Sequence, residues 1–199
     1  PIVKIGHPAL RVRLKDLSLA WIKRPATKTL VRRMARLMVE SAGVGLAANQ
    51  MGLPYRLFVM QRQDGSEGVE AFLNPHIVAR SRGEVLDWEG CLSIPGFRGL
   101  VPRAEKVTLE AVSLEGKKVR REFSGFAARI VQHETDHLDG FLYVDRMRDL
   151  RSLTHEDEIG DCTQAALHHA TRRGGASGPR RAAPPDPHGP GRPGQGGQV

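Results

Sequence analysis

The residues best suited to chemistry lie in the stretch QHETDHLDG, residues 132–140, which contains an H-E-x-x-H pattern. His133 and His137 are four residues apart, so on a helix both imidazoles lie on one face and can bind one metal ion. Glu134 follows the first histidine and can point at a water molecule on that metal. Two histidines do not fill a metal site, so a third ligand must come from elsewhere in the chain.

Two residues compete for the position of third ligand. Glu156 follows His137 at a spacing that suits a gluzincin-type peptidase, although THEDEIGD lacks the asparagine-containing surroundings of that class. Cys91 lies in WEGCLSIPGFRG, as where a strand ends and turns, and one Cys with two His completes a three-ligand catalytic site. A metzincin is excluded because LDGFLY follows His137 and supplies no third histidine. The residues alone leave Cys91 and Glu156 open.

The metal-binding side chains require a helix, which the pattern predicts over residues 125–138. Ser124 can cap its start, and Asp139-Gly140 can end it. The apolar residues Phe126 and Ile130 share the metal-binding face, which indicates a site for an apolar substrate side chain.

The other predicted elements give an α+β class, a single domain with one central helix packed on largely antiparallel strands. RPATKTLVRRMARLMVESAG predicts an amphipathic helix whose buried face holds Leu30, Val31, Met34, Leu37 and Met38. YRLFVM, VEAFLNPHIV and EVLDWEGCLSI are typical of strands, and EKVTLEAVSLEG with KKVRREF predicts a hairpin turning at Glu115-Gly116. GFLYVDR predicts a short strand, and a final helix is expected to start near Thr154.

Length, composition and charge indicate the general class of the protein. The 199 residues are 40% hydrophobic, with a net charge of +8 that favours polyanionic partners. No apolar run reaches membrane-spanning length and the first residues do not resemble a signal peptide, so we expect a protein that is not exported. Two cysteines, Cys91 and Cys162, argue against a disulfide framework.

Residues 1–171 form the predicted domain. The Gly/Pro/Arg-rich residues 172–199 form a predicted disordered tail, read as an extension without a role or as an arm for RNA or the ribosome.

Three motifs together resemble the signature motifs of peptide deformylases: GVGLAANQ at 43–50, EGCLS at 89–93 and QHETDH at 132–137. They occur in the order and at about the spacing of that family, and the resemblance extends from VKIGHPALR to GFLYVDRM. Two further stretches, GFRGLVPRAEKVTL and SGFAARIVQHETDHLDG, look like the mitochondrial-type branch, which some bacteria share.

The resemblance implies an enzyme that removes formate from the N-formyl-methionine of nascent chains. It implies Cys91, His133 and His137 as ligands of one divalent metal, with Fe²⁺ expected and Zn²⁺, Ni²⁺ or Co²⁺ as alternatives. Glu134 would be the general base, which later returns a proton to the departing amine. The Gln50 amide and the Leu92 backbone N–H would stabilise the oxyanion.

The resemblance also implies the substrate contacts and the partners. The expected contacts are Val44, Gly45, Arg98, Phe126 and Ile130. Formyl-methionyl nascent peptides are the expected partner, with the ribosome as a second, and neither a membrane nor DNA is expected. A monomer in the bacterial cytoplasm is the predicted form, and a mature organellar protein is the alternative.

The remaining residues near the motifs carry weaker expectations. Glu89 and Arg103 are expected to form a buried pair that braces the Cys91 loop. Asp136 is either the partner of a ligand imidazole or an exposed acid. Arg129 stands where many bacterial members have an apolar residue, and Asn49 is assigned no role. A gluzincin-type peptidase and a non-catalytic ribosome- or RNA-binding protein on the same fold are the competing functions.

Overall fold

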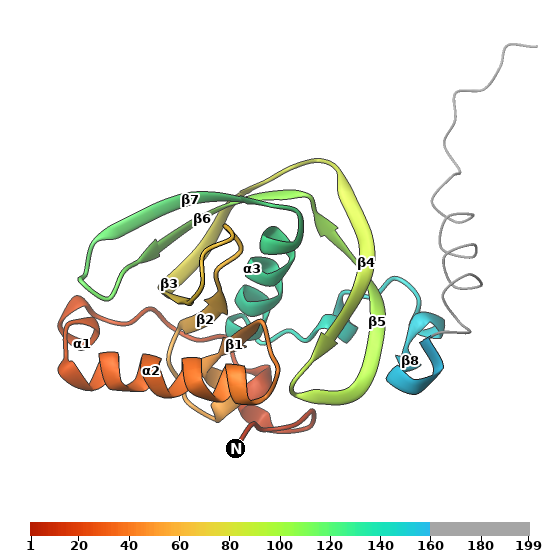
Figure 1. The fold of residues 1–199 in the computed structure, drawn as a ribbon, viewed down its shortest axis with the longest axis horizontal. Helices are drawn as coiled ribbons and strands as arrows, with labels where there is room; N and C mark the ends of the chain where they lie inside the picture. Colours follow the sequence, from red (N-terminus) through yellow and green to blue (C-terminus); the bar gives the residue numbers. More distant parts are fainter. Residues whose placement is uncertain (160–199) are drawn as a thin grey trace, which may run out of the picture.

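The computed structural model describes residues 1–159, which form two antiparallel sheets and two main helices (Figure 1). Cys162, the predicted domain boundary at residue 171 and the predicted tail lie outside the described residues. The larger sheet has the order β1-β2-β3-β6-β7 and the smaller one β4-β5-β8, with every pair antiparallel. The predicted α+β class and the single domain are therefore confirmed.

The elements have the following bounds. The helices are α1 (Leu19–Ile22), α2 (Pro25–Glu40) and α3 (Gly125–Leu138). The strands of the larger sheet are β1 (Gly45–Ala47), β2 (Leu57–Gln61), β3 (Val69–Arg80), β6 (Lys106–Val112) and β7 (Lys118–Ser124). Those of the smaller sheet are β4 (Glu84–Cys91), β5 (Ile94–Ala104) and β8 (Thr154–His155). Short 3-10 helices are η1 (Pro8–Arg11), η2 (Ala48–Met51), η3 (Tyr143–Asp145), η4 (Leu150–Ser152) and η5 (Glu156–Glu158).

The predicted central helix is α3, and Figure 1 shows it between the larger sheet and the long β4–β5 hairpin. Its buried residues Ala128, Val131 and Leu138 pack in one cluster with the aromatic side chains of the larger sheet. Ser124 occupies the N-cap position, but its side chain makes no capping hydrogen bond, so that detail of the prediction is wrong. The helix ends as predicted, because Gly140 adopts a left-handed φ of 85° that few other residues tolerate.

Helix α2 buries the face that the sequence predicted. Val31, Met34 and Met38 are buried against the larger sheet, while Leu30 and Leu37 pack partly buried around them. Pro25 stands in its first turn, where the missing N–H removes no helical hydrogen bond. Among the described residues, no helix is both long and apolar enough to cross a membrane.

Three parts of the smaller sheet and its surroundings differ from the prediction. Strand β5 was not predicted, because its sequence IPGFRGLVPRA is rich in Gly and Pro. The segment GFLYVDR holds the 3-10 helix η3 instead of a strand, because the carboxylate of Asp145 accepts a hydrogen bond from the Leu142 N–H and closes a tight turn. Thr154 begins β8 and not a helix; the 3-10 helix η5 follows, and Ile159, the last described residue, is helical.

Candidate metal centre

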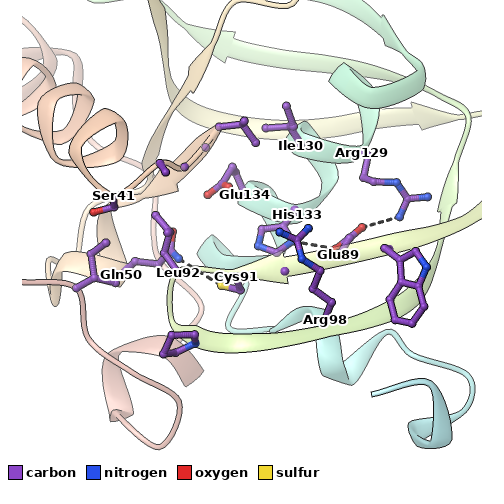
Figure 2. Close-up of a pocket in the computed structure, with 18 of the residues that line it drawn as sticks. Ser41, Gln50, Glu89, Cys91, Leu92, Arg98, Arg129, Ile130, His133 and Glu134 are labelled. Carbon is purple, nitrogen blue, oxygen red and sulfur yellow. Dashed lines mark hydrogen bonds and ion pairs between the residues drawn. The ribbon is translucent and has the colours of Figure 1, made fainter. Parts of the chain in front are cut away.

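The three ligands implied by the resemblance converge in the structure. Cys91 ends β4, and Figure 2 shows it beside His133 of α3. His137 lies one turn further along the same helix. The Cys91 Sγ atom is 3.3 Å from His137 Nε2, which is 3.2 Å from His133 Nε2. All three donor atoms lie within 4.8 Å of one another, and Glu156 is not part of this group.

The donor atoms fit a tetrahedral metal ion. Metal–sulfur bonds of about 2.3 Å and metal–nitrogen bonds of about 2.0 Å give tetrahedral edges of about 3.3–3.6 Å, close to the separations of the donor atoms. The Nδ1 atom of His133 is 2.9 Å from a Glu89 carboxylate oxygen, so the ring proton belongs on Nδ1 and the Nε2 lone pair faces the other donors. Nitrogen lone pairs and a sulfur at these separations repel one another, and a cation bound between them would remove that repulsion.

Electrostatics at the cluster favour a thiolate. Burial alone would raise the pKa of the Cys91 thiol, but the positive charge and hydrogen bonds of His137 and His133 outweigh it and hold that pKa well below its ordinary value. The thiolate is the form of cysteine that binds metals. A thiolate at Cys91 would supply the anionic ligand that a divalent cation prefers, beside two imidazoles at metal-ligand spacing.

Glu89 holds His133 from behind. One carboxylate oxygen accepts from Arg103 Nε at 2.8 Å, and the other accepts from Arg103 Nη2 at 3.0 Å and from His133 Nδ1 at 2.9 Å. Burial would raise the pKa of Glu89, but the hydrogen bonds from His133 and Arg103 outweigh it and lower the pKa. The predicted Glu89–Arg103 pair is confirmed, and its carboxylate fixes the ring orientation of one candidate ligand.

Arg129 is a second cation on Glu89 that the sequence did not reveal. Its Nη1 atom donates to Glu89 at 2.8 Å and to the Val101 carbonyl at 2.9 Å, while Nη2 donates to the Val85 carbonyl at 2.7 Å. The residue is only 6% exposed. Arg129 therefore joins α3 to both strands of the β4–β5 hairpin at the carboxylate that orients His133 (Figure 2).

We predict that Arg129→Met loosens the metal site without unfolding the protein. Loss of a partner that supports a metal ligand typically weakens metal binding by about 10–100-fold, and Glu89 would lose one of its two cations. The measurement is the rate at which the protein loses its metal to a chelator. Arg129→Lys should lose metal at a rate between those of wild type and Arg129→Met, because a lysine cannot reach all three acceptors. Arg82→Met, at an exposed position, is the control; equal metal loss in wild type and Arg129→Met would contradict this role.

Asp136 fits neither of its two predicted environments. It is 7% exposed, and its carboxylate accepts from Arg103 at 2.5 Å and from Arg146 at 2.6 and 3.0 Å. Its partners are thus two guanidinium groups and not a ligand imidazole. Asp136 instead extends the buried charge network from Glu89 through Arg103 to Arg146.

Glu134 lies beside the candidate ligands with a free carboxylate oxygen. The side chain is 4% exposed, and its Oε2 atom has no hydrogen-bond partner among the described residues. Burial raises the pKa of Glu134 to about 7, against the opposing pull of the two histidines. A buried carboxyl without a partner is costly unless a ligand or water satisfies it, and a pKa near neutrality suits proton transfer.

Gly45, on β1, leaves room for this carboxylate. A Cβ atom at position 45 would lie 2.3 Å from Glu134 Oε1, far below any real contact. We predict that Gly45→Ala lowers kcat by about 10²-fold or more, the effect of displacing a catalytic group by about 1 Å, while metal content is unchanged. Gly83→Ala is the control, because a Cβ there meets nothing within 4 Å. Steady-state kinetics and metal analysis of both variants test this, and a fully active Gly45→Ala enzyme would sink it.

The two predicted oxyanion donors flank Cys91. Gln50, on η2, is 2% exposed and donates through Nε2 to Ser93 Oγ at 3.2 Å and toward Cys91 Sγ at 3.5 Å. Its Oε1 atom accepts from the Ala47 N–H at 2.9 Å, so the amide is held in one orientation. Leu92 directly follows Cys91 in the turn between β4 and β5. Gln50 is therefore a buried and oriented amide, not a surface glutamine.

A short N-terminal segment joins the loops that carry these donors. The Val3 N–H donates to the Gln50 carbonyl at 2.8 Å, and the Ile5 N–H donates to the Ser93 carbonyl at 2.8 Å. Between them, Lys4 Nζ donates to the Leu92 carbonyl at 2.8 Å. The segment thus bridges η2 and the β4–β5 turn.

Asn49 has a structural role that the sequence did not indicate. It is fully buried, and its Nδ2 atom donates to the His137 carbonyl at 2.6 Å and to the Ala9 carbonyl at 3.3 Å. It therefore ties η2 to the last turn of α3, where a candidate ligand sits. No spacing rule could have found this contact, because its partners are remote in the sequence.

A cavity of about 630 Å³ opens beside the cluster. All five predicted substrate contacts line it: Val44, Gly45, Arg98, Phe126 and Ile130. Ile130 is buried, whereas Val44 and Phe126 are 37% and 55% exposed. The carboxylate of Glu156 lies 3.3 Å from Arg98 Nε, with both side chains about half exposed. Glu156 is thus a partner of Arg98 at the cavity, and the alternative that made it the third metal ligand is not supported.

Two histidines and a cysteine at metal-ligand spacing, a buried carboxylate beside them and a cavity with apolar and polar walls are typical of a mononuclear metal hydrolase. Comparison with known proteins narrows this class, because a sequence profile described as Polypeptide deformylase matches residues 1–152. The chain belongs to the polypeptide deformylase family.

Individual relatives agree with this assignment. A peptide deformylase of Dictyoglomus turgidum is 43% identical over 155 residues, which cover 78% of this chain and 97% of the relative. The structure of a class I type b peptide deformylase from Acinetobacter baumannii with bound Met-Ala-Ser matches with a TM-score of 0.70 at 36% identity, covering 74% of this chain and 97% of that one. The enzyme from Thermotoga maritima matches with a TM-score of 0.70 at 35% identity, covering 75% and 97%.

Proposed function

We propose that this chain hydrolyses the formamide of N-terminal formyl-methionine on nascent polypeptides and releases formate. The observation that carries the proposal is the buried Glu134 carboxylate beside Cys91, His133 and His137, whose Oε2 atom has no hydrogen-bond partner within residues 1–159. These three residues would hold one divalent ion, which supplies the Lewis acidity that acidifies water and polarises a carbonyl. Fe²⁺ is the proposed metal, with Zn²⁺, Ni²⁺ and Co²⁺ as alternatives for the same donor set.

In this proposal Glu134 moves the protons. It accepts a proton from the attacking water and then delivers one to the departing amine, which would otherwise be a poor leaving group. A pKa of about 7 lets one carboxyl perform both transfers near neutral pH. Burial also keeps bulk water from competing for its oxygen atoms.

Gln50 and Leu92 are the proposed donors to the oxyanion. The Gln50 amide is already oriented by Ala47 and Ser93, so little reorganisation is needed when negative charge develops. Removing one such donor typically costs about 10²–10³-fold in kcat. The Leu92 backbone N–H would donate from the adjacent turn.

The methionine side chain would occupy the apolar part of the cavity. Ile130 supplies a buried wall, and Phe126 and Val44 line the cavity with more exposed side chains. The backbone of Gly45, at the end of the larger sheet, would pair with the peptide as an added strand. Arg98 would meet the residues that follow methionine.

The wider context forms part of the same proposal. Residues 1–171 would be the catalytic unit and residues 172–199 a separate tail. The enzyme would act as a monomer on peptides emerging from the ribosome in the bacterial cytoplasm, with a mature organellar enzyme as the alternative. The relatives named above come from bacteria.

The test is formate release from formyl-Met-Ala-Ser under anaerobic conditions. We expect one formate and one free Met-Ala-Ser for each molecule of substrate consumed. A peptide without the formyl group should not be cleaved. Cleavage at internal peptide bonds would instead support a metallopeptidase. Absence of both products from metal-loaded protein would support a non-catalytic role on this fold.

A further inference from the structure

The positive charge of the described residues is concentrated in one segment. Residues 1–159 contain 25 Lys/Arg and 20 Asp/Glu, but residues 23–39 contain six Lys/Arg and no acid. The rest of the described chain therefore holds 19 basic and 20 acidic residues and is close to neutral. The six residues are Lys23, Arg24, Lys28, Arg32, Arg33 and Arg36, called the α2 basic face below.

This face is ordered by the helix that carries it. Lys28, Arg32 and Arg36 recur every four residues of α2 and so form a stripe along one side. All six residues are exposed, while Val31 and Met34 on the opposite side are buried in the core. Four of the six charges are thus presented outward on a helix about 24 Å long, and Lys23 and Arg24 directly precede it.

The α2 basic face has few counter-charges; Glu40, four residues after Arg36 at the end of α2, forms no ion pair with it within 4.0 Å. Within residues 1–159, none of its six side chains forms an ion pair within 4.0 Å. Glu115, in the turn between β6 and β7, interacts with Lys28 only at longer range. Several exposed arginines elsewhere have carboxylate partners, for example Arg120 with Glu110 and Arg148 with Glu84. Like charges four residues apart destabilise a helix, so the stripe is maintained against its own repulsion.

The side chains of the α2 basic face suit a partner that carries phosphate groups. Four of its six residues are arginines, whose guanidinium groups bind phosphate with two donors at once. The face offers no aromatic anchor of the kind that centres protein interfaces. It also cannot insert into a bilayer, because the apolar side of α2 is packed against the larger sheet.

We propose that the α2 basic face binds the phosphate backbone of RNA. The chain that leaves the C-terminal end of α2 lines the catalytic cavity at residues 41–45, so RNA bound along α2 would lie next to the cavity. The choice of RNA over DNA rests on the proposed function, since nascent peptides emerge from an RNA-rich particle. The charge argument itself is independent of catalysis.

The test measures binding of a fluorescein-labelled RNA duplex to the full-length chain as a function of KCl concentration. In the variant, Arg32→Gln, Arg33→Gln and Arg36→Gln are combined. A plot of log K against log salt concentration has a negative slope, and each lost phosphate contact reduces its magnitude by about one. We therefore expect the magnitude of the slope to decrease by about three in this variant. Affinity at about 50 mM KCl should fall at least about tenfold. The C-terminal arginines are present in every variant and contribute equally.

A matched variant combines Arg80→Gln, Arg82→Gln and Lys106→Gln, three exposed residues without ion pairs among residues 1–159. It removes the same charge and should keep most of the affinity. Equal loss in both variants, or no loss in the α2 variant, overturns the proposal. So does an α2 variant that loses binding to phosphatidylglycerol vesicles but not to RNA, and so does preference for a DNA duplex.

Formate release from formyl-Met-Ala-Ser separates this proposal from the proposed function. The α2 variant should keep wild-type kcat and KM on this short peptide, because none of its residues lines the cavity. A wild-type chain that binds RNA through α2 but releases no formate would refute the deformylase proposal alone.

Discussion

Glu134→Gln is expected to lower kcat by about 10²–10⁴-fold while the protein keeps its full complement of metal. General acid–base catalysis contributes about that factor, and an amide of the same shape can neither accept nor return the proton. Metal content should be unchanged because Glu134 lies outside the three-residue donor group. The substitution also removes the buried carboxyl without a partner, so thermal stability should not fall.

Steady-state kinetics with metal analysis of the same preparation check this result. The pH profile gives a second reading, since the limb due to Glu134 should vanish in the variant. A variant that loses both metal and activity would make Glu134 a ligand and remove it from the role of base. A variant with near-normal kcat would mean that another group moves the protons.

Cys91→Ala is expected to remove most of the bound metal and the activity together. Even indirect supports of a metal ligand are worth about 10–100-fold in affinity, so loss of a direct ligand should exceed that range. The remaining two imidazoles would leave one face of the site open. Cys91→Asp offers a matched oxygen ligand and should recover some metal with altered preference.

The paired control is Glu156→Gln. Glu156 contacts Arg98 at the cavity and not the donor group, so this variant should keep its metal and its kcat. Metal quantification after gel filtration distinguishes the two. If Glu156→Gln loses the metal while Cys91→Ala retains it, the ligand set described here is wrong.

Local sequence patterns predicted those elements whose periodicity is complete within one segment. Helix α3 and its end at Gly140 follow from helical spacing and a glycine stop, and the buried side of α2 follows from the spacing of Val31, Met34 and Met38. The convergence of Cys91 with the two histidines was implied by the three motifs rather than by spacing. The structure supplies the reason, because β4 ends against the last turns of α3.

Contacts between remote segments were beyond such patterns. Strand β5 was missed because Pro95 and Pro102 are unfavourable in strands, yet β8 pairs with β5 only opposite Phe97 and Arg98, which lie between the two prolines. The sequence did not indicate that Arg129 is paired, since its partner Glu89 lies 40 positions away. A buried charge cannot be inferred until its counter-charge is located.

The N-terminal segment that bridges η2 and the β4–β5 turn gives the catalytic loops an opening equilibrium of their own. Segments outside the sheets open locally at a lower free energy than the core, and no sheet has to unfold when Val3 and Ile5 release their two carbonyl acceptors. In native-state hydrogen exchange, the amides of Val3 and Ile5 should therefore exchange through local fraying, while that of Met60 in β2 exchanges only on global unfolding. A peptide that binds only the closed loops would slow hydrogen exchange at the amides of Val3 and Ile5 and leave that at Met60 unaffected. The two N-terminal amides would then report occupancy of a site in which they take no chemical part.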